Sequence, residues 1–427
     1  MFGIAGIRGP YGSCITEELI EGITKNFAEG KIAIGRDIRQ SGKSLKEAAI
    51  RGAIEAGSDV YDLGIAPTPT VALASKKYGL GAMITASHNP IDHNGIKLMK
   101  KGRELTPEEG NTIYQNYLTK KEKISNKKGN VFFDNETIKE HIELIKKEVK
   151  VEKKLKVIID CNGAAAVITP YLIHSLGCDV ISINTSLEEF FRPSEPKQEN
   201  LLALSSAVRA MKADIGIAHD ADADRCIVLD RNGKQIPLDV QLAIMIEEEM
   251  KRGAKKIGAT VEASLLIRET VEKNNGKVVI TPVGSTYLAL EIEKEKVDFA
   301  GEPCGEYIYK NGILAPDGVM TAAKFVEIAS KQDLLELTKK YTTYPIIRKW
   351  YHVTQKHFLM EKIKKEIAER YPKFSDLDGI RVDEEDGWFL VRASGTEDII
   401  RLTMEYKDEK KLQNRKKEIE KIIRTIL

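Results

Sequence analysis

Short apolar runs rich in β-branched residues alternate with helix-like segments over most of the chain. In the first block, the runs 31–37, 59–65 and 81–87 are separated by segments with helical periodicity. Buried parallel strands read as continuous apolar runs, and the crossovers that join them are usually helices. The pattern therefore predicts α/β layers, in a first domain over residues 1–130.

The same alternation begins again twice. A second block starts with the apolar run 155–166, and a third starts with a helical segment at 238–252. These blocks predict further α/β domains over residues 131–236 and 237–342. The three blocks share their length and order without a strict sequence period, so we expect structural repetition.

The last part of the chain has a different order of elements. Apolar runs at 348–354, 379–395 and 399–406 precede a charged helix at 407–427. Strands around a hairpin with helices to one side are typical of a small α+β domain, which we place at 343–427. The predicted fold class is α/β, with three mixed α/β domains of similar topology and a C-terminal α+β domain.

The net charge of the chain bears on which macromolecules it can attract. The 66 basic and 64 acidic side chains nearly cancel to a formal +2, so the whole-molecule field attracts neither nucleic acid nor an anionic membrane. Any recognition of an anion must therefore be local. Five cysteines without a CxxC pair, no signal-like start and no membrane-length apolar run predict a cytoplasmic protein. No heptad or apolar stripe indicates an oligomeric state.

A polar cluster, TASHNP at 85–90, directly follows an apolar run. The ends of strands are where α/β folds present ligands, so Ser87 is a candidate nucleophile. His88 beside it is a further candidate catalytic residue, although neighbours on an extended loop point in different directions. An ordinary polar loop closed by Asn-Pro is the alternative.

Three aspartates, Asp220, Asp222 and Asp224, alternate between two apolar runs. Carboxylates packed so closely repel one another unless a cation neutralises them, and oxygen ligands suit Mg²⁺ or Ca²⁺. An EF-hand loop is excluded because Arg225 and Arg231 stand where that loop needs glycine and glutamate. Mg²⁺ bound at such a site can also coordinate a phosphate oxygen. A purely structural ion is the alternative.

The tail loop RASGTE at 392–397 combines cationic and hydroxyl side chains around a glycine. Arg392, Ser394, Gly395 and Thr396 suit a cradle for a dianionic phosphate, and Arg401 can join them. The alternative is a β-turn with glycine at its tight position.

The loop GEPCGE at 301–306 follows an apolar run of the third block. Glu302 and Glu306 flank a turn and can accept hydrogen bonds from sugar hydroxyls. Cys304 between them is a small loop residue, since nothing nearby lowers the pKa of its thiol.

Four further basic side chains of the first block are candidate site residues. Arg8 and the arginines of 35–39 stand beside glycines, where they can line an anionic site or pair with acids. Lys97 is a candidate general acid/base if it is buried near other charges. An exposed lysine at a strand end is the alternative.

The four loops TASHNP, DADADR, GEPCGE and RASGTE, in this order, resemble those of the α-D-phosphohexomutase superfamily. The resemblance covers the whole chain. It implies four domains around a central cleft, each contributing one loop, with a C-terminal domain like the TATA-binding protein. It also implies a phosphosugar partner, Mg²⁺ as cofactor, and a sugar 1,6-bisphosphate as intermediate and activator.

The resemblance also implies a role for each loop. Ser87 becomes a phosphoserine and holds Mg²⁺ through its phosphate, together with Asp220, Asp222 and Asp224. Arg8 and Lys97 match residues near the reacting centre. The substrate-binding residues are Arg225, Glu302, Cys304, Arg392, Ser394, Gly395 and Thr396, to which we add Glu306 and Arg401.

Three departures from the family pattern bear on geometry and specificity. Ala221 and Ala223 replace two glycines of the metal loop, which we expect to be tolerated only with negative φ. Cys304 and Glu306 replace a serine and a histidine of the family's sugar-binding loop, so the motif does not identify the sugar substrate. Asp398 replaces a frequent proline.

The predicted function is a phosphosugar mutase, an isomerase that interconverts sugar 6-phosphate and sugar 1-phosphate. Glucosamine phosphate is slightly favoured, because the chain resembles short archaeal members of the superfamily with similar GEP loops. In addition, Glu306 can pair with a sugar ammonium. Glucose, mannose and pentose phosphates are alternatives. A metal-dependent phosphosugar phosphatase and a non-catalytic phosphosugar-binding protein are alternatives of other classes.

Overall fold

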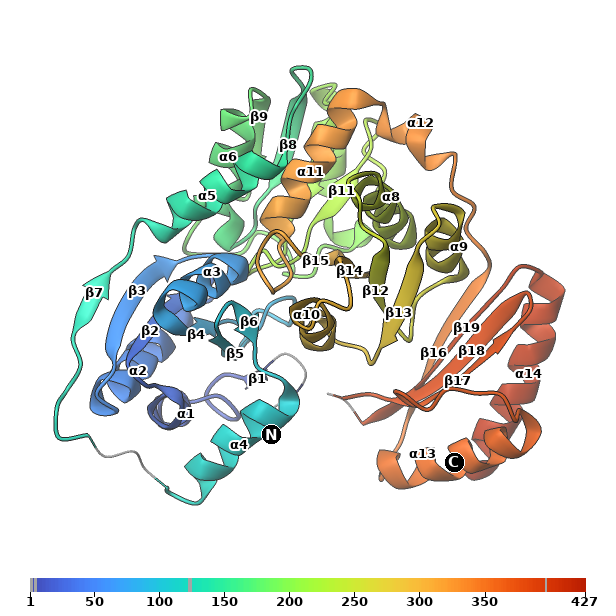
Figure 1. The fold of residues 1–427 in the computed structure, drawn as a ribbon, viewed down its shortest axis with the longest axis horizontal. Coiled ribbons are helices and arrows are strands. Elements are labelled where there is room, and N and C mark those ends of the chain that lie inside the picture. The colour runs from blue at the N-terminus through green and yellow to red at the C-terminus, as the bar shows by residue number, and fades with distance from the viewer. Residues whose placement is uncertain (1–2, 4–5, 122–124, 396–397) are drawn as a thin grey trace.

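The computed structural model describes residues 3, 6–121, 125–395 and 398–427. Within these residues the chain forms four successive sheets, each packed with helices from its own part of the chain (Figure 1). No helix among them is long and apolar enough to cross a membrane.

The first sheet has the strand order β1-β5-β4-β2-β3-β7, with β6 paired to β5. β2 runs parallel to β3 and β4, whereas β5 is antiparallel to β4. The elements are β1 (Ile7–Pro10), α1 (Glu17–Phe27), β2 (Lys31–Arg36), α2 (Gly42–Glu55), β3 (Asp59–Ile65), α3 (Thr68–Tyr78), β4 (Gly79–Ile84), β5 (His93–Lys100), β6 (Arg103–Glu104), α4 (Pro107–Leu118) and β7 (Val131–Phe133).

The continuous apolar run of β2 follows from burial on both faces. Ile32 and Ile34 join the core formed with α1 and α2, whereas Ala33 joins the core on the α3 side. A strand covered by helices on both sides has no polar face, which is why its sequence does not alternate.

The second and third sheets repeat this topology. Their orders are β9-β8-β10-β11 and β13-β12-β14-β15, in which the first three strands are parallel and the last is antiparallel. The order β3-β2-β4-β5 of the first sheet is the same. The predicted repetition of three α/β domains is therefore confirmed.

The second sheet comprises β8 (Lys156–Asp160), β9 (Asp179–Ile183), β10 (Ile215–Ala218) and β11 (Ile227–Leu229), with helices α5 (Thr137–Glu148), α6 (Thr169–Ser175) and α7 (Leu202–Ala210). The third comprises β12 (Lys256–Thr260), β13 (Lys277–Thr281), β14 (Phe299–Glu302) and β15 (Glu306–Tyr309), with helices α8 (Leu238–Lys251), α9 (Leu265–Lys273), α10 (Ser285–Glu293), α11 (Gly318–Lys331) and α12 (Leu334–Thr338). One apolar core runs through both domains.

The C-terminal sheet is antiparallel, in the order β16-β19-β18-β17. It comprises β16 (Ile346–His352), β17 (Ile380–Glu384), β18 (Gly387–Ala393) and β19 (Ile399–Tyr406), with helices α13 (Lys356–Arg370) and α14 (Glu409–Ile426). Both helices cover one face of the sheet (Figure 1). The predicted α+β domain is confirmed. The domain boundaries given from the sequence stay predictions.

Candidate active site

Three of the four polar loops occupy equivalent positions in the fold. The serine loop joins β4 to β5, the aspartate loop joins β10 to β11, and the acidic loop 303–305 joins β14 to β15. Each connects the last parallel strand of its sheet to the antiparallel strand beside it. The phosphate loop lies between the antiparallel strands β18 and β19. The three α/β domains thus present their chemically distinctive loops from the same kind of strand connection, and the C-terminal domain presents its loop from an antiparallel hairpin.

Ser87 lies in the serine loop with its side chain buried against the aspartate loop. Its hydroxyl donates a hydrogen bond to Asp220 Oδ2 at 2.8 Å, and its amide donates to Thr85 Oγ1 at 2.8 Å. Its φ of 49° is left-handed. Since this conformation costs a residue with a side chain about 1–2 kcal/mol, contacts with the rest of the protein must stabilise it.

Arg39, fully buried, supplies most of those contacts. Its guanidinium donates to the carbonyls of Ser87 at 2.6 Å and Asn89 at 2.9 Å, and to two further carbonyls of the loop. Asp37 anchors it, accepting from Nε at 3.1 Å, and also accepts a hydrogen bond from Thr85. Arg39 therefore shapes the serine loop and does not line an anion site.

Asp220, Asp222 and Asp224 form a buried cluster in which one oxygen of each lies within 4.8 Å of the others. Asp222 Oδ2 accepts a hydrogen bond from Thr68 at 2.5 Å, and Asp224 Oδ2 accepts one from Lys97 at 2.6 Å. The Oδ1 atoms of these two aspartates are buried without a hydrogen-bond partner among the described residues. Buried carboxylate oxygens without donors suit a hard divalent cation, so the residues present fit a metal ion.

The pKa values of the aspartates reflect burial and mutual repulsion. Burial, followed by the charges of Asp224 and Asp222, raises the pKa of Asp220. Burial and the charge of Asp222 raise the pKa of Asp224 to about 7. Burial opposes ionisation of Asp222 as well, but the charges of Lys97 and Arg8 outweigh it and lower the pKa. A bound cation relieves such repulsion and favours the ionised forms.

The backbone of the aspartate loop overturns one expectation. Ala223 has a φ of 54°, whereas Ala221 is not in the left-handed region. The loop turns tightly there, with the amide of Ala223 donating to the carbonyl of Asp220 at 3.3 Å. The prediction that both alanines have negative φ was therefore wrong at Ala223, where the turn imposes a conformation that glycine adopts more readily.

Lys97, on β5, is buried inside the carboxylate cluster. Its Nζ lies 2.6 Å from Asp224 Oδ2, 3.0 Å from Asp222 Oδ2 and 3.4 Å from Glu104 Oε1. Burial by itself lowers the pKa of Lys97, but the three acids outweigh it and raise the pKa well above the usual value. The alternative of an exposed strand-end lysine is excluded, and the side chain is a charged proton donor in this state.

His88 and Arg8 lie at the edge of the same cluster. His88 Nδ1 is 3.5 Å from Ser87 Oγ, which is long for a hydrogen bond. The charge of Arg225, then burial and the charge of Arg8, lower the pKa of His88, so its ring is neutral. Arg8 lies next to the serine loop, with Nη1 3.4 Å from the carbonyl of Ala86.

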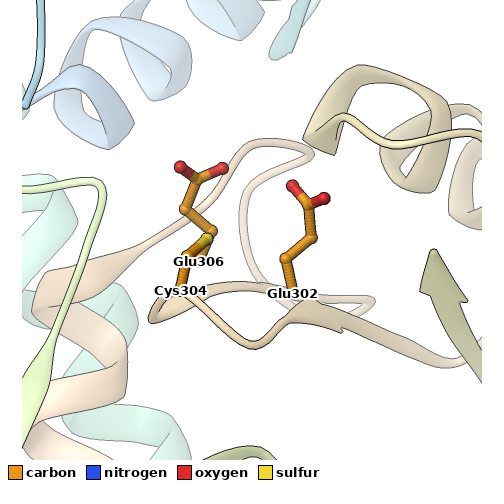
Figure 2. Close-up of side chains that lie close together, drawn as sticks. All are labelled: Glu302, Cys304 and Glu306. Carbon is orange, nitrogen blue, oxygen red and sulfur yellow. The ribbon is translucent and has the colours of Figure 1, made fainter. Parts of the chain in front are cut away.

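Glu302, Cys304 and Glu306 lie side by side in the acidic loop, with both carboxylates pointing the same way (Figure 2). Glu306 Oε1 accepts from Arg225 Nε at 3.0 Å. Burial and the charge of Glu306 raise the pKa of Glu302 to about 8. Burial raises the pKa of the Cys304 thiol, which excludes a reactive thiolate. Glu306 therefore holds Arg225, and a direct contact of Glu306 with substrate stays a prediction.

A cavity of about 770 Å³ is lined by residues of all four domains. His88 comes from the first, Arg225 from the second, Glu302 from the third and Arg392 from the fourth. The predicted central cleft is therefore confirmed. Its size suits a small ligand.

The phosphate loop reaches this cleft from the C-terminal sheet. Arg392 and Arg401 are paired across β18 and β19, and both line the cavity. Ser394 is buried and Gly395 is exposed. Thr396 lies outside the described residues. The two arginines place cationic groups in the cavity that the acidic loop also lines.

Models of four successive family domains match the chain. Phosphoglucomutase/phosphomannomutase alpha/beta/alpha domains I, II and III match residues 1–124, 136–233 and 238–344, and the C-terminal domain matches 352–422. The chain belongs to the phosphoglucomutase/phosphomannomutase family. Together with the mutase names of its relatives, the family match shows that this protein is a phosphosugar mutase, which is an isomerase.

Relatives from archaea match this mutase over nearly its full length. A probable phosphoglucosamine mutase of Methanococcoides burtonii is 37% identical, covering 96% of this chain and 95% of its own. One of Pyrococcus abyssi is 37% identical, covering 99% and 97%.

Solved structures of the family show the same fold. A phosphoglucomutase/phosphomannomutase family protein from Burkholderia thailandensis has a TM-score of 0.89 at 24% identity, covering 100% of this chain and 97% of its own. Aspergillus fumigatus N-acetylphosphoglucosamine mutase, in complex with GlcNAc-6P and magnesium, has a TM-score of 0.62 at 15% identity, covering 100% and 95%. The family and the aspartate triad together support a metal cofactor.

Several residues of the mutase's site carry no motif in the sequence. Thr68, at the start of α3, holds Asp222, and Glu104 contacts the ammonium of Lys97. Arg348, on β16, lines the cleft. The contacts of Thr68 and the position of Arg348 depend on distant parts of the chain, and the contact of Glu104 depends on the pairing of β5 with β6, so sequence motifs do not find these side chains.

Proposed function

We propose that this mutase interconverts glucosamine 6-phosphate and glucosamine 1-phosphate through phospho-Ser87 and a sugar 1,6-bisphosphate. The contact of Ser87 Oγ with Asp220 Oδ2 carries the proposal. It places a hydroxyl directly against a carboxylate cluster that fits a metal, as phosphoryl transfer requires. The archaeal relatives, named probable phosphoglucosamine mutases, support the choice of sugar.

In this proposal Asp220, Asp222 and Asp224 hold Mg²⁺ together with the Ser87 phosphate. When bound, the ion neutralises charge on the oxygens of the transferring group. Arg8 and Arg225 add positive charge from the protein. Because phosphoryl transfer has a loose, charge-spreading transition state, positioning and cationic groups supply most of the catalysis.

The first transfer breaks the Oγ–P bond of phospho-Ser87 as the free hydroxyl of the sugar phosphate bonds to phosphorus. That hydroxyl loses a proton, and Ser87 Oγ gains one. We assign Lys97 as the group that relays this proton, since it is a buried titratable side chain within the cluster. The products are a sugar bisphosphate and an unmodified serine.

The bisphosphate then reorients within the cleft so that its other phosphoryl group faces Ser87. That group is transferred to Ser87 by the reverse chemistry. A clamp that accepts either phosphate is needed for this. We assign it to the C-terminal domain, in which the strand pair β18 and β19 lines the cleft. The assigned residues are Arg392, Ser394, Gly395, Thr396 and Arg401, while Glu302 and Cys304 contact the sugar hydroxyls.

The test incubates the protein with Mg²⁺ and a trace of glucose 1,6-bisphosphate. Separate samples contain the 1-phosphates of glucosamine, glucose, mannose or ribose, and ³¹P NMR follows the products. We expect glucosamine phosphate to isomerise with the highest kcat/KM and without release of inorganic phosphate. Preference for another sugar overturns only the substrate assignment. Stoichiometric phosphate release indicates a phosphatase, and binding without turnover indicates a non-catalytic protein.

A further inference from the structure

We infer that Ser194 is a positioning residue whose hydroxyl sets the spacing between the serine loop and the aspartate loop. Ser194 Oγ donates to the carbonyl of Ser87 at 2.7 Å and accepts from the amide of Ala221 at 3.1 Å. Ala221 lies between Asp220 and Asp222. One hydroxyl of the second domain thus bridges the backbones of the two loops. The inference rests on the proposed function, in which these loops react together.

The segment that carries Ser194 is itself fixed to the second domain. Arg192, which is buried, donates to Asp160 Oδ2 at 2.9 Å and to the carbonyl of His219 at 2.6 Å. Asn162 Oδ1 accepts from the amide of Phe191 at 3.0 Å. Because Phe191 and Arg192 anchor the chain just before Ser194, the hydroxyl holds Ser87 against a fixed part of the second domain.

Phosphorylation of Ser87 makes this bridge more important. The direct side-chain hydrogen bond of Ser87 to the aspartate loop, among the described residues, is the bond from its hydroxyl to Asp220. When Oγ carries a phosphoryl group it has no proton to donate, so that bond is lost. The bridge through Ser194 uses only the Ser87 carbonyl and the Ala221 amide, which phosphorylation leaves unchanged. Ser194 can therefore hold the two loops in register in both states of the enzyme.

The same domain contains a matched control. Ser205 is also buried, and its hydroxyl donates to the carbonyl of Gly233 at 2.6 Å and accepts from Arg209 at 2.7 Å. Ser205→Ala removes a bridging hydroxyl of the same kind, in contact with neither loop. A second control is Ser194→Thr, which retains the hydroxyl; Ser194 borders a cavity of about 1030 Å³.

The experiment compares the wild type with Ser194→Ala, Ser194→Thr and Ser205→Ala. For Ser194→Ala we expect kcat to fall about 10- to 100-fold, because displacement of reacting groups by about 1 Å has effects of that size. KM stays within about twofold, since the substrate touches other residues. The Thr variant and Ser205→Ala keep a kcat within about threefold of the wild type.

Hydrogen exchange of the unliganded protein supplies a readout without turnover. We expect Ser194→Ala to speed exchange in the peptides covering 85–90 and 219–226, and Ser205→Ala to leave both unchanged. If Ser194→Ala matches Ser205→Ala in exchange and in kcat, the inference is overturned. If the wild type isomerises no sugar phosphate, the proposed function fails, and the exchange data still decide whether Ser194 couples the loops.

Discussion

Replacing Arg39 by methionine tests how the serine loop is held in its strained conformation. The side chain keeps its apolar stem but loses the guanidinium that binds Asp37 and the loop carbonyls, including that of Ser87. Both members of the Arg39–Asp37 pair have fully buried side chains. The change therefore leaves a buried carboxylate without its cation.

Removing one partner of a buried ion pair costs about 3–5 kcal/mol of the free energy of unfolding. Protonation of the remaining carboxyl limits that cost. Burial already raises the pKa of Asp37, and Arg39 counteracts the rise. Without Arg39 the folded-state pKa rises further above the unfolded value of about 3.9. A folded state that binds the extra proton loses stability as pH rises, so the deficit is larger at about pH 8 than at about pH 5.

Hydrogen exchange of the amides in β4 measures this cost locally, with intrinsic exchange rates divided out at each pH. Arg36→Met is the control, because Arg36 donates a single hydrogen bond to the Asp37 carbonyl, at 2.8 Å, worth about 0.5–1.5 kcal/mol. Arg39→Met combined with Asp37→Asn should recover part of the loss and remove its pH dependence. A loss below about 1 kcal/mol for Arg39→Met, or one that does not change with pH, refutes the reasoning.

Two further perturbations test the metal cluster and its loop. Asp224→Asn replaces one carboxylate oxygen by an amide nitrogen and removes the negative charge, and we expect Mg²⁺ affinity measured by calorimetry to fall at least about tenfold; unchanged affinity contradicts the assigned ligand set. Ala223→Gly relieves a left-handed alanine whereas Ala221→Gly does not, so the first variant should be more stable than the second by about 1–2 kcal/mol in thermal unfolding. Equal melting temperatures argue against strain at Ala223.

The repeated topology and the position of each loop could be predicted from the sequence, because both depend on local patterns. Continuous apolar runs such as 31–37 identified buried strands, and turn-prone polar residues marked where they end. The alternation in 220–224 pointed to a cation, since carboxylates at that spacing repel one another unless positive charge neutralises them. Each of these signals lies within a few residues of chain.

Contacts between domains are beyond such local signals. Ser194 stands in a segment without a motif, and its bond to Ser87 spans 107 positions. From the sequence, Glu306 could be identified only as an acidic residue of the predicted sugar-binding loop, whereas in the fold it forms an ion pair with Arg225. The positive φ of Ala223 depends on how tightly the loop must turn to bring three carboxylates together. Tertiary geometry decides all three.

The most direct test of the central claim follows the phosphoryl group on Ser87 during turnover. Wild-type enzyme and Ser87→Ala are mixed with glucosamine 6-phosphate, Mg²⁺ and ³²P-labelled glucose 1,6-bisphosphate, quenched at early times and digested for mass spectrometry. The proposed mechanism predicts label on the peptide containing Ser87 at a rate at least equal to kcat, and neither label nor isomerisation in Ser87→Ala. Isomerisation by Ser87→Ala at the wild-type rate, or label on another residue, would contradict it.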